Sequence, residues 1–166
     1  MYPAHRILDR AVRYFPDRLA IVDGDIRWTY RELGARVNRL ANALAGLGLR
    51  KGDRVAILDW NSARYAEAYY ACALSGLTFL PLNSRLAAPE LEYIFDDSDA
   101  RALLLSKPFA GIYDELKSRA PSLEITIGMG LDELSDGMHD YEALLAAATD
   151  QAQPVAASGD DIIQIY

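Results

Sequence analysis

The sequence contains a single cysteine and two histidines among its 166 residues. Cys72 lies among apolar residues in YYACALSG and has no partner for a disulfide or a cysteine-based zinc site. His5 and His139 are far apart and show neither His-x-x-x-His nor Glu-x-x-His spacing. We therefore predict no metal site, and a cysteine that serves as a small buried apolar side chain in a reducing compartment.

Positive charge and long apolar runs are also scarce. Seventeen Lys and Arg stand against 24 Asp and Glu, a formal net charge of -7, and no stretch combines basic with aromatic residues. This excludes nucleic acid as an expected partner. No run approaches the roughly 18 apolar residues of a membrane span, and the charged N-terminal stretch is unlike a secretory signal. We predict a cytoplasmic protein without a transmembrane segment.

Hydrophobic residues make up 51% and charged residues 25% of the chain, which is typical of a globular domain with a packed core. Apolar residues recur at helical spacing from Ile7 to Phe15, and Pro16 ends that pattern. Two strand-like runs, 19–22 and 26–29, are joined by Asp-Gly-Asp, which predicts a β-hairpin.

A second helix is predicted from Tyr30 to Leu47. Thr29 and Glu32 have the spacing of a capping box, in which each side chain accepts a hydrogen bond from the other residue's backbone N–H. Apolar residues follow at steps of three and four, and Gly48 stands where a left-handed cap would end the helix.

The remainder alternates short apolar runs with helical patterns. Apolar runs begin at Arg54, Thr78, Arg101 and Glu124, and a last one begins at Ile162; the helical patterns span 62–74, 89–95, 109–119 and 141–148. Continuous apolar runs with one helix between them are typical of parallel strands buried on both faces. We predict an α/β fold, with a mainly parallel sheet flanked by helices on both faces and preceded by a helix and a β-hairpin.

A candidate binding site follows the second of these strands. Asn83 and Arg85 come directly after TFLPL, where a parallel sheet would place a ligand. Arg85 is suited to a phosphate or carboxylate, and Asn83 to a loop or a ligand amide. The alternative is structural: Asn83 caps the strand end and Arg85 pairs with a carboxylate.

Two other stretches are interpreted as ordinary surface structure. The glycine-rich segment 128–137 has Glu133 where a dinucleotide loop needs its third glycine, and it lacks the Lys-Ser or Lys-Thr of a P-loop. Asp96, Asp97 and Asp99 indicate a solvated helix end. We could assemble no catalytic residues from the sequence.

Three segments carry a family resemblance. They are WTYRELGARVNRLANALAGLGLRKGDRVAIL (28–58), ACALSGLTFLPLNSRL (71–86) and PELEYIFDDSDARALL (89–104). In this order they resemble the N-terminal part of the AMP-forming acyl-CoA synthetases, which are adenylate-forming enzymes. The resemblance implies an incomplete N-terminal domain. Residues 1–50 would belong to a neighbouring subdomain, and 51–166 would form a sheet subdomain.

The resemblance extends to the last residues, GDDIIQIY. They are similar to the family strand that leads into a Thr-, Ser- and Gly-rich phosphate loop, so that loop would begin after Tyr166. The resemblance therefore implies a chain without catalytic residues that is inactive alone and binds no cofactor tightly. The apolar face of the helix from Tyr30 to Leu47 would then be exposed, fold back, or form a homodimer.

The family implies that the parent protein activates a carboxylic acid, of the fatty or aromatic kind, with ATP and Mg2+, and transfers it to CoA. An amino-acid adenylation domain is the alternative within the superfamily, although Asn83 after Pro-Leu is more typical of acyl-CoA synthetases than the Asp of adenylation domains. A further alternative is a stand-alone binding or interaction module.

Overall fold

The computed structural model describes residues 4–152 and 157–166. In chain order the elements are α1 (His5–Tyr14), β1 (Leu19–Asp23), β2 (Ile26–Thr29), α2 (Tyr30–Gly46), β3 (Arg54–Leu58), α3 (Ala63–Ser75), β4 (Thr78–Pro81), α4 (Ala88–Ser98), β5 (Ala102–Ser106), the 3-10 helix η1 (Lys107–Ile112), α5 (Tyr113–Arg119), β6 (Ile125–Met129), β7 (Met138–Asp140) and α6 (Tyr141–Ala147).

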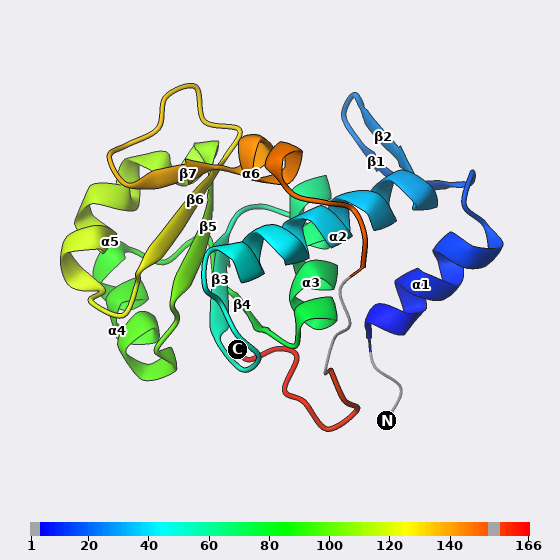
Figure 1. The fold of residues 1–166 in the computed structure, drawn as a ribbon. Coiled ribbons are helices and arrows are strands. Elements are labelled where there is room, and N and C mark those ends of the chain that lie inside the picture. The colour runs from blue at the N-terminus through cyan, green and yellow to red at the C-terminus, as the bar shows by residue number, and fades with distance from the viewer. Residues whose placement is uncertain (1–3, 153–156) are drawn as a thin grey trace.

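The centre of the fold is a five-stranded sheet in the order β4-β3-β5-β6-β7, and every neighbouring pair is parallel. Alternate residues of β3 point to opposite faces. Val55 and Ile57 join a core with α2, α3 and α6, whereas Ala56 and Leu58 join a core with α4 and α5. Figure 1 shows these helices on the two sides of the sheet. The predicted α/β fold is confirmed.

Local signals correctly located the elements that precede the sheet. The hairpin pairs β1 with β2 antiparallel across Gly24, whose φ is 56°. The Thr29 N–H donates to Glu32 Oε2 at 2.8 Å, and the Glu32 N–H donates to Thr29 Oγ1 at 3.3 Å, so the capping box is present. Gly48 has a φ of 94°, as a left-handed helix end requires.

The apolar face of α2 is buried within the described chain. Leu33, Val37, Leu40 and Leu44 are each at most 3% exposed, and they belong to the same core as Val55 of the sheet. Of the three arrangements considered for this helix, the structure shows the one in which it folds back. The subdomain boundary at residue 50 stays a prediction.

Among the elements up to α6, two differ from their predicted form and one was not predicted. The predicted helix 109–119 is divided into η1 and α5; the proline of the sequence KPFAGI removes an amide donor, and its glycine weakens helix propensity. α4 is longer than the predicted 89–95. β7 was not predicted at all, since it is only three residues long and depends on pairing with β6.

The polar side of α2 holds the segment that follows α6. Asn42 Nδ2 donates to the carbonyls of Thr149 and Gln151 at 2.7 and 2.9 Å, and Asn38 Nδ2 donates to that of Asp150 at 2.9 Å. The stretch 149–161, whose Ala, Ser, Pro and Gln content is typical of an exposed connector, includes residues 153–156, which lie outside the described residues. Within the described chain, every helix is too short or too polar to cross a bilayer.

Candidate functional site

The carboxyl ends of the parallel strands share one edge of the sheet, the carboxyl edge. β3 lies between β4 and β5, so the loop after β3 lies between the loops that follow its neighbours. Ligands of open parallel sheets bind outside the carboxyl ends, where loops carry the polar groups. The carboxyl edge is therefore where a site is expected.

Asn83 and Arg85, the site residues predicted from the sequence, lie in the turn after β4. The backbone N–H of Arg85 donates to Asn83 Oδ1 at 3.0 Å, and that of Leu86 donates to the Asn83 carbonyl at 3.1 Å. Both predicted residues are exposed. Among the residues that the structure describes, no carboxylate forms an ion pair with Arg85. Asn83 thus shapes the turn, as its structural alternative expected, and the Arg85 guanidinium is exposed; the binding role of both residues stays a prediction.

Two aromatic side chains that the sequence analysis did not single out also lie at this edge. Trp60, two residues after β3, is 62% exposed, and its ring packs edge-on against Phe109 with centroids 5.6 Å apart. Asp59 accepts hydrogen bonds from the Trp60 N–H at 2.8 Å and from Ser62 Oγ at 2.5 Å. An aromatic residue two positions after a buried strand was the signal available. Such an exposed ring can stack on a planar ligand.

The last residues lie beside β4 and run toward the carboxyl edge. Phe79 N–H donates to the Ile163 carbonyl at 3.0 Å, and Ile165 N–H donates to the Phe79 carbonyl at 3.1 Å, so Gln164 pairs with Phe79 in parallel. This register carries Tyr166 toward the end of β4. The strand predicted from Ile162 is wrong in extent, because these two hydrogen bonds make one bridge rather than a ladder.

The other polar groups considered from the sequence do not converge. Asp99 is the left-handed cap of α4, with a φ of 48°, and its carboxylate lies 3.2 Å from Arg54. His139 lies in β7, opposite Ile127, whereas His5 begins α1. In the described parts of the chain, no three His, Cys, Asp or Glu side chains gather where they could hold a metal ion.

The glycine-rich stretch 128–137 contributes its first two residues to β6 and then forms a loop that enters β7. Gly130 and Gly137 have φ values of 67° and 85°, which a residue with a side chain rarely adopts. Phosphate loops of the dinucleotide and P-loop types lead into a helix N-terminus, and this one leads into a strand. The geometry agrees with an ordinary loop.

A buried ionic cluster that the sequence did not predict joins three helices. They lie on the face of the sheet that α2, α3 and α6 cover. Glu67 of α3 is 0% exposed; Arg36 Nε of α2 lies 2.8 Å from its Oε1, and Tyr141 Oη of α6 donates to its Oε2 at 2.8 Å. Arg36 also pairs with Glu142 at 3.0 Å and lies over the Trp28 ring, 4.4 Å from its centroid. The cluster connects α2, α3 and α6.

The environment perturbs the carboxylates of this cluster in opposite directions. Burial raises the pKa of Glu67, and the favourable contacts with Arg36 and Tyr141 only partly offset that effect. Burial also acts to raise the pKa of Glu142, but hydrogen bonds and charge from Arg36 and Arg64 outweigh it, so that pKa is lowered. Perturbed groups often mark functional sites, but Glu67 has no exposed surface, so we assign the cluster a structural role.

Comparison with known proteins places these features in a family. Residues 8–166 match the AMP-binding enzyme family. The long-chain-fatty-acid–CoA ligase FadD13 of Mycobacterium tuberculosis is 38% identical over 143 residues, which are 86% of this chain and 27% of the ligase. A feruloyl-CoA synthase of Amycolatopsis sp is 45% identical over 95 residues, or 57% of this chain and 19% of the synthase. The chain spans less than a third of these relatives.

Solved structures show the same fold. The N-terminal domain of FACL13 from Mycobacterium tuberculosis superposes with a TM-score of 0.88 at 30% identity, over 99% of this chain and 41% of that one. The anthranilate CoA ligase AuaEII in complex with anthranoyl-AMP gives a TM-score of 0.93 at 26% identity, over 98% of this chain and 31% of the ligase. The chain therefore belongs to the AMP-binding enzyme family, and its fold is that of the N-terminal region of acyl-CoA ligases.

Proposed function

We propose that this chain is the N-terminal part of an AMP-forming acyl-CoA synthetase. The parent would join a carboxylic acid, a fatty acid being the first candidate, to AMP from ATP, release pyrophosphate, and then transfer the acyl group to CoA. The observation that carries the proposal is the match of residues 8–166 to the AMP-binding family, together with relatives that are acyl-CoA ligases.

The geometry of the carboxyl edge supports this assignment. Residues 163–165 run parallel to β4 and carry Tyr166 toward the turn that holds Asn83 and Arg85. A phosphate loop that followed Tyr166 would thus begin near the end of β4, and the turn after β4 carries the exposed Arg85 guanidinium. We propose that Arg85 binds a phosphate or carboxylate of a substrate there, while Asn83 keeps the turn in shape.

The residues at this edge fit a nucleotide better than they fit its metal. Arg85 offers a charge for phosphate, and Trp60 offers an aromatic face for a planar ring. The described residues bring together no set of carboxylates for Mg2+, so the ion would be held by parts of the parent beyond these residues. ATP, Mg2+ and CoA are thus cofactors of the proposed parent. The 166-residue chain would not bind them tightly.

Acid-dependent ATP/pyrophosphate exchange tests the proposal. The gene should continue past Tyr166 into a Thr-, Ser- and Gly-rich loop, and the longer product should catalyse exchange with fatty or aromatic acids, whereas the 166-residue chain shows none. Exchange with amino acids alone would favour the adenylation-domain alternative. A stop codon after Tyr166 in the native gene would favour the non-catalytic module. Exchange by the short chain would contradict the assignment.

Three further expectations belong to the same proposal. Residues 1–50 would contact a neighbouring subdomain of the parent, and the protein would be cytoplasmic. A homodimer would use the apolar side chains that α1 and β1 leave exposed, rather than the buried face of α2. These exposed side chains are Ile7, Tyr14, Leu19 and Val22, each more than half exposed. Sedimentation of a concentration-independent monomer would contradict the dimer.

A further inference from the structure

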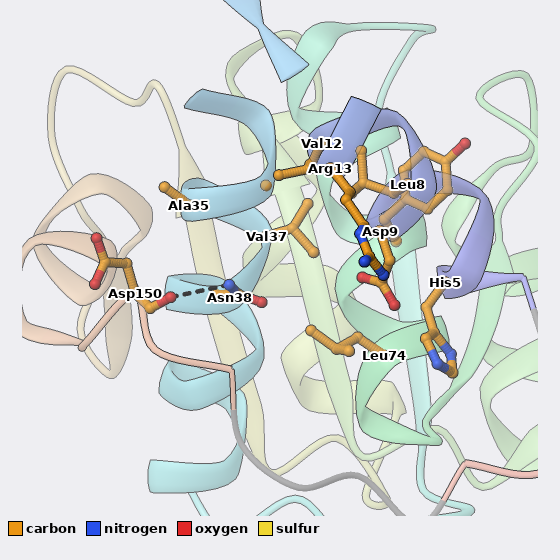
Figure 2. Close-up of a pocket in the computed structure, with 12 residues that line it drawn as sticks. His5, Leu8, Asp9, Val12, Arg13, Ala35, Val37, Asn38, Leu74 and Asp150 are labelled. Atoms are coloured by element: carbon orange, nitrogen blue, oxygen red, sulfur yellow. Dashed lines mark hydrogen bonds between the residues drawn. The ribbon is translucent and has the colours of Figure 1, made fainter. Parts of the chain in front are cut away.

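A cavity of about 330 Å³ lies between α1, α2 and α3, and none of its lining residues belongs to the carboxyl edge as described above. Figure 2 shows its side chains converging from α1 on one side and α2 on the other. The volume is at the lower end of the range of small-molecule sites.

The inner wall of the cavity is apolar. Leu8 and Val12 of α1 face Val37 of α2 and Leu74 of α3 across it. Gly34 lets α1 approach α2 closely, since a Cβ at this position would lie 2.8 Å from Val12 Cγ2. Such a wall suits the hydrocarbon part of a ligand.

The rim offers hydrogen-bond acceptors that the described chain does not satisfy. His5 Nδ1 is buried and has no hydrogen-bond partner. Asp9 forms no ion pair with any residue that the structure describes. The Asn38 amide nitrogen donates to the Asp150 carbonyl at 2.9 Å, which fixes the amide and leaves its oxygen as a further acceptor.

Two other charged side chains line the cavity. The Arg13 guanidinium lies 5.7 Å from the centroid of the Tyr14 ring, in a cation–π contact. Asp150 lies 3.7 Å from an Arg39 nitrogen. Asp9 is therefore the carboxylate of the rim that no described residue pairs, and Arg13 keeps its positive charge.

From this arrangement we propose that the cavity binds a small molecule with a primary ammonium head and an apolar body. The Asp9 carboxylate would pair with the ammonium, and the Asn38 oxygen, or His5 Nδ1 when the imidazole proton is on Nε2, would accept a hydrogen bond from one of its remaining N–H donors. The apolar body would lie against Leu8, Val12, Val37 and Leu74. This site is independent of the function proposed for the carboxyl edge.

The test titrates the 166-residue chain with three ligands that share a phenyl body. Two-dimensional amide NMR spectra monitor the binding. Phenethylamine should cause saturable shifts in α1 and in Asn38, phenethyl alcohol should bind about fivefold more weakly, and phenylacetate should be the weakest. Asp9→Asn should weaken phenethylamine binding about fivefold.

Asp25→Asn is the matched control, because it removes the same charge from the exposed hairpin turn and should leave the affinity unchanged. Equal binding of the amine and the alcohol, preferred binding of phenylacetate, or an unchanged affinity in Asp9→Asn would each overturn the proposal. The absence of saturable shifts with phenethylamine would do the same. Asp9 is at the surface, so Asp9→Asn is expected to fold.

Discussion

Replacing Arg36 by methionine tests how much the ionic cluster matters to the fold. Methionine keeps much of the length and apolar volume of the arginine stem, so the change removes mainly charge and hydrogen bonds. Glu67 then loses the partner 2.8 Å from its Oε1, although Tyr141 Oη still donates to it. Its carboxylate stays buried with one hydrogen bond and no counter-charge.

The expected cost follows from the burial of the two partners. Removing one member of a buried ion pair costs about 3–5 kcal/mol. The Arg36 side chain is 22% exposed, and Tyr141 remains as a donor, so the lower end applies. Loss of the cation–π contact with Trp28 contributes about 0.5–1 kcal/mol. We expect Arg36→Met to lower the free energy of unfolding by about 3 kcal/mol at about pH 8.

The same substitution should make stability depend more steeply on pH. Burial already raises the pKa of Glu67 above its value in the unfolded chain, and losing Arg36 raises it further. A raised pKa means that the folded state holds its proton more tightly. Its contribution to stability is therefore present below the unfolded pKa and is lost as the pH rises through the folded pKa. The cost of Arg36→Met should thus be smaller at acid pH, where Glu67 is protonated, than at about pH 8.

Urea unfolding followed by circular dichroism measures these free energies. The control is the double variant Arg36→Met with Glu67→Gln, in which no charge is buried and the extra pH dependence should disappear. A cost below about 1 kcal/mol at about pH 8, or an equal cost at both pH values, would refute the account of Glu67 as a buried carboxylate.

Three other predictions concern separate parts of the chain. Thr29→Ala should lower the free energy of unfolding by about 1 kcal/mol through loss of the capping box, and Thr29→Ser should not; equal effects in urea melts would contradict the role of the hydroxyl. Burial raises the pKa of the Cys72 thiol to about 12, so a thiol reagent at neutral pH should modify it only after denaturation, and rapid labelling of the folded chain would contradict its burial. Asn42→Ala should speed amide exchange in the segment after α6, as measured by mass spectrometry, and unchanged exchange would show that its two hydrogen bonds do not hold that segment.

Sequence reasoning succeeded where short-range chemistry decides the structure. The Asp-Gly pair of the hairpin and the Thr29–Glu32 capping box act within a few residues, and continuous apolar runs revealed strands buried on both faces. At the candidate site, local pattern placed Asn83 and Arg85 after β4. It did not show that Trp60 packs on Phe109, because that contact depends on how two loops meet at the carboxyl edge.

Glu67 shows why local sequence patterns could not predict the ionic cluster. Within its helix it is one of two charged residues, and a charged residue is on its own typical of a solvated position. Its burial depends on Tyr141, 74 positions later, and on Arg36, 31 positions earlier. A pattern of neighbouring residues cannot reveal contacts between positions so far apart in the sequence. The strand pairing that creates β7 depends in the same way on β6.

The ionic cluster also fixes the position of α6. Burying Glu67 without its partners would cost free energy, so arrangements that move α6 away from Glu67 are disfavoured. The cluster therefore holds α6 in one position along α2. Beyond the undescribed residues, Lys51 pairs with Asp161 at 2.9 Å and Thr78 Oγ1 donates to the Ile162 carbonyl at 3.0 Å, which hold the last segment against β4. Contacts at the amino ends of β3 and β4 therefore set the direction in which Tyr166 approaches the candidate site.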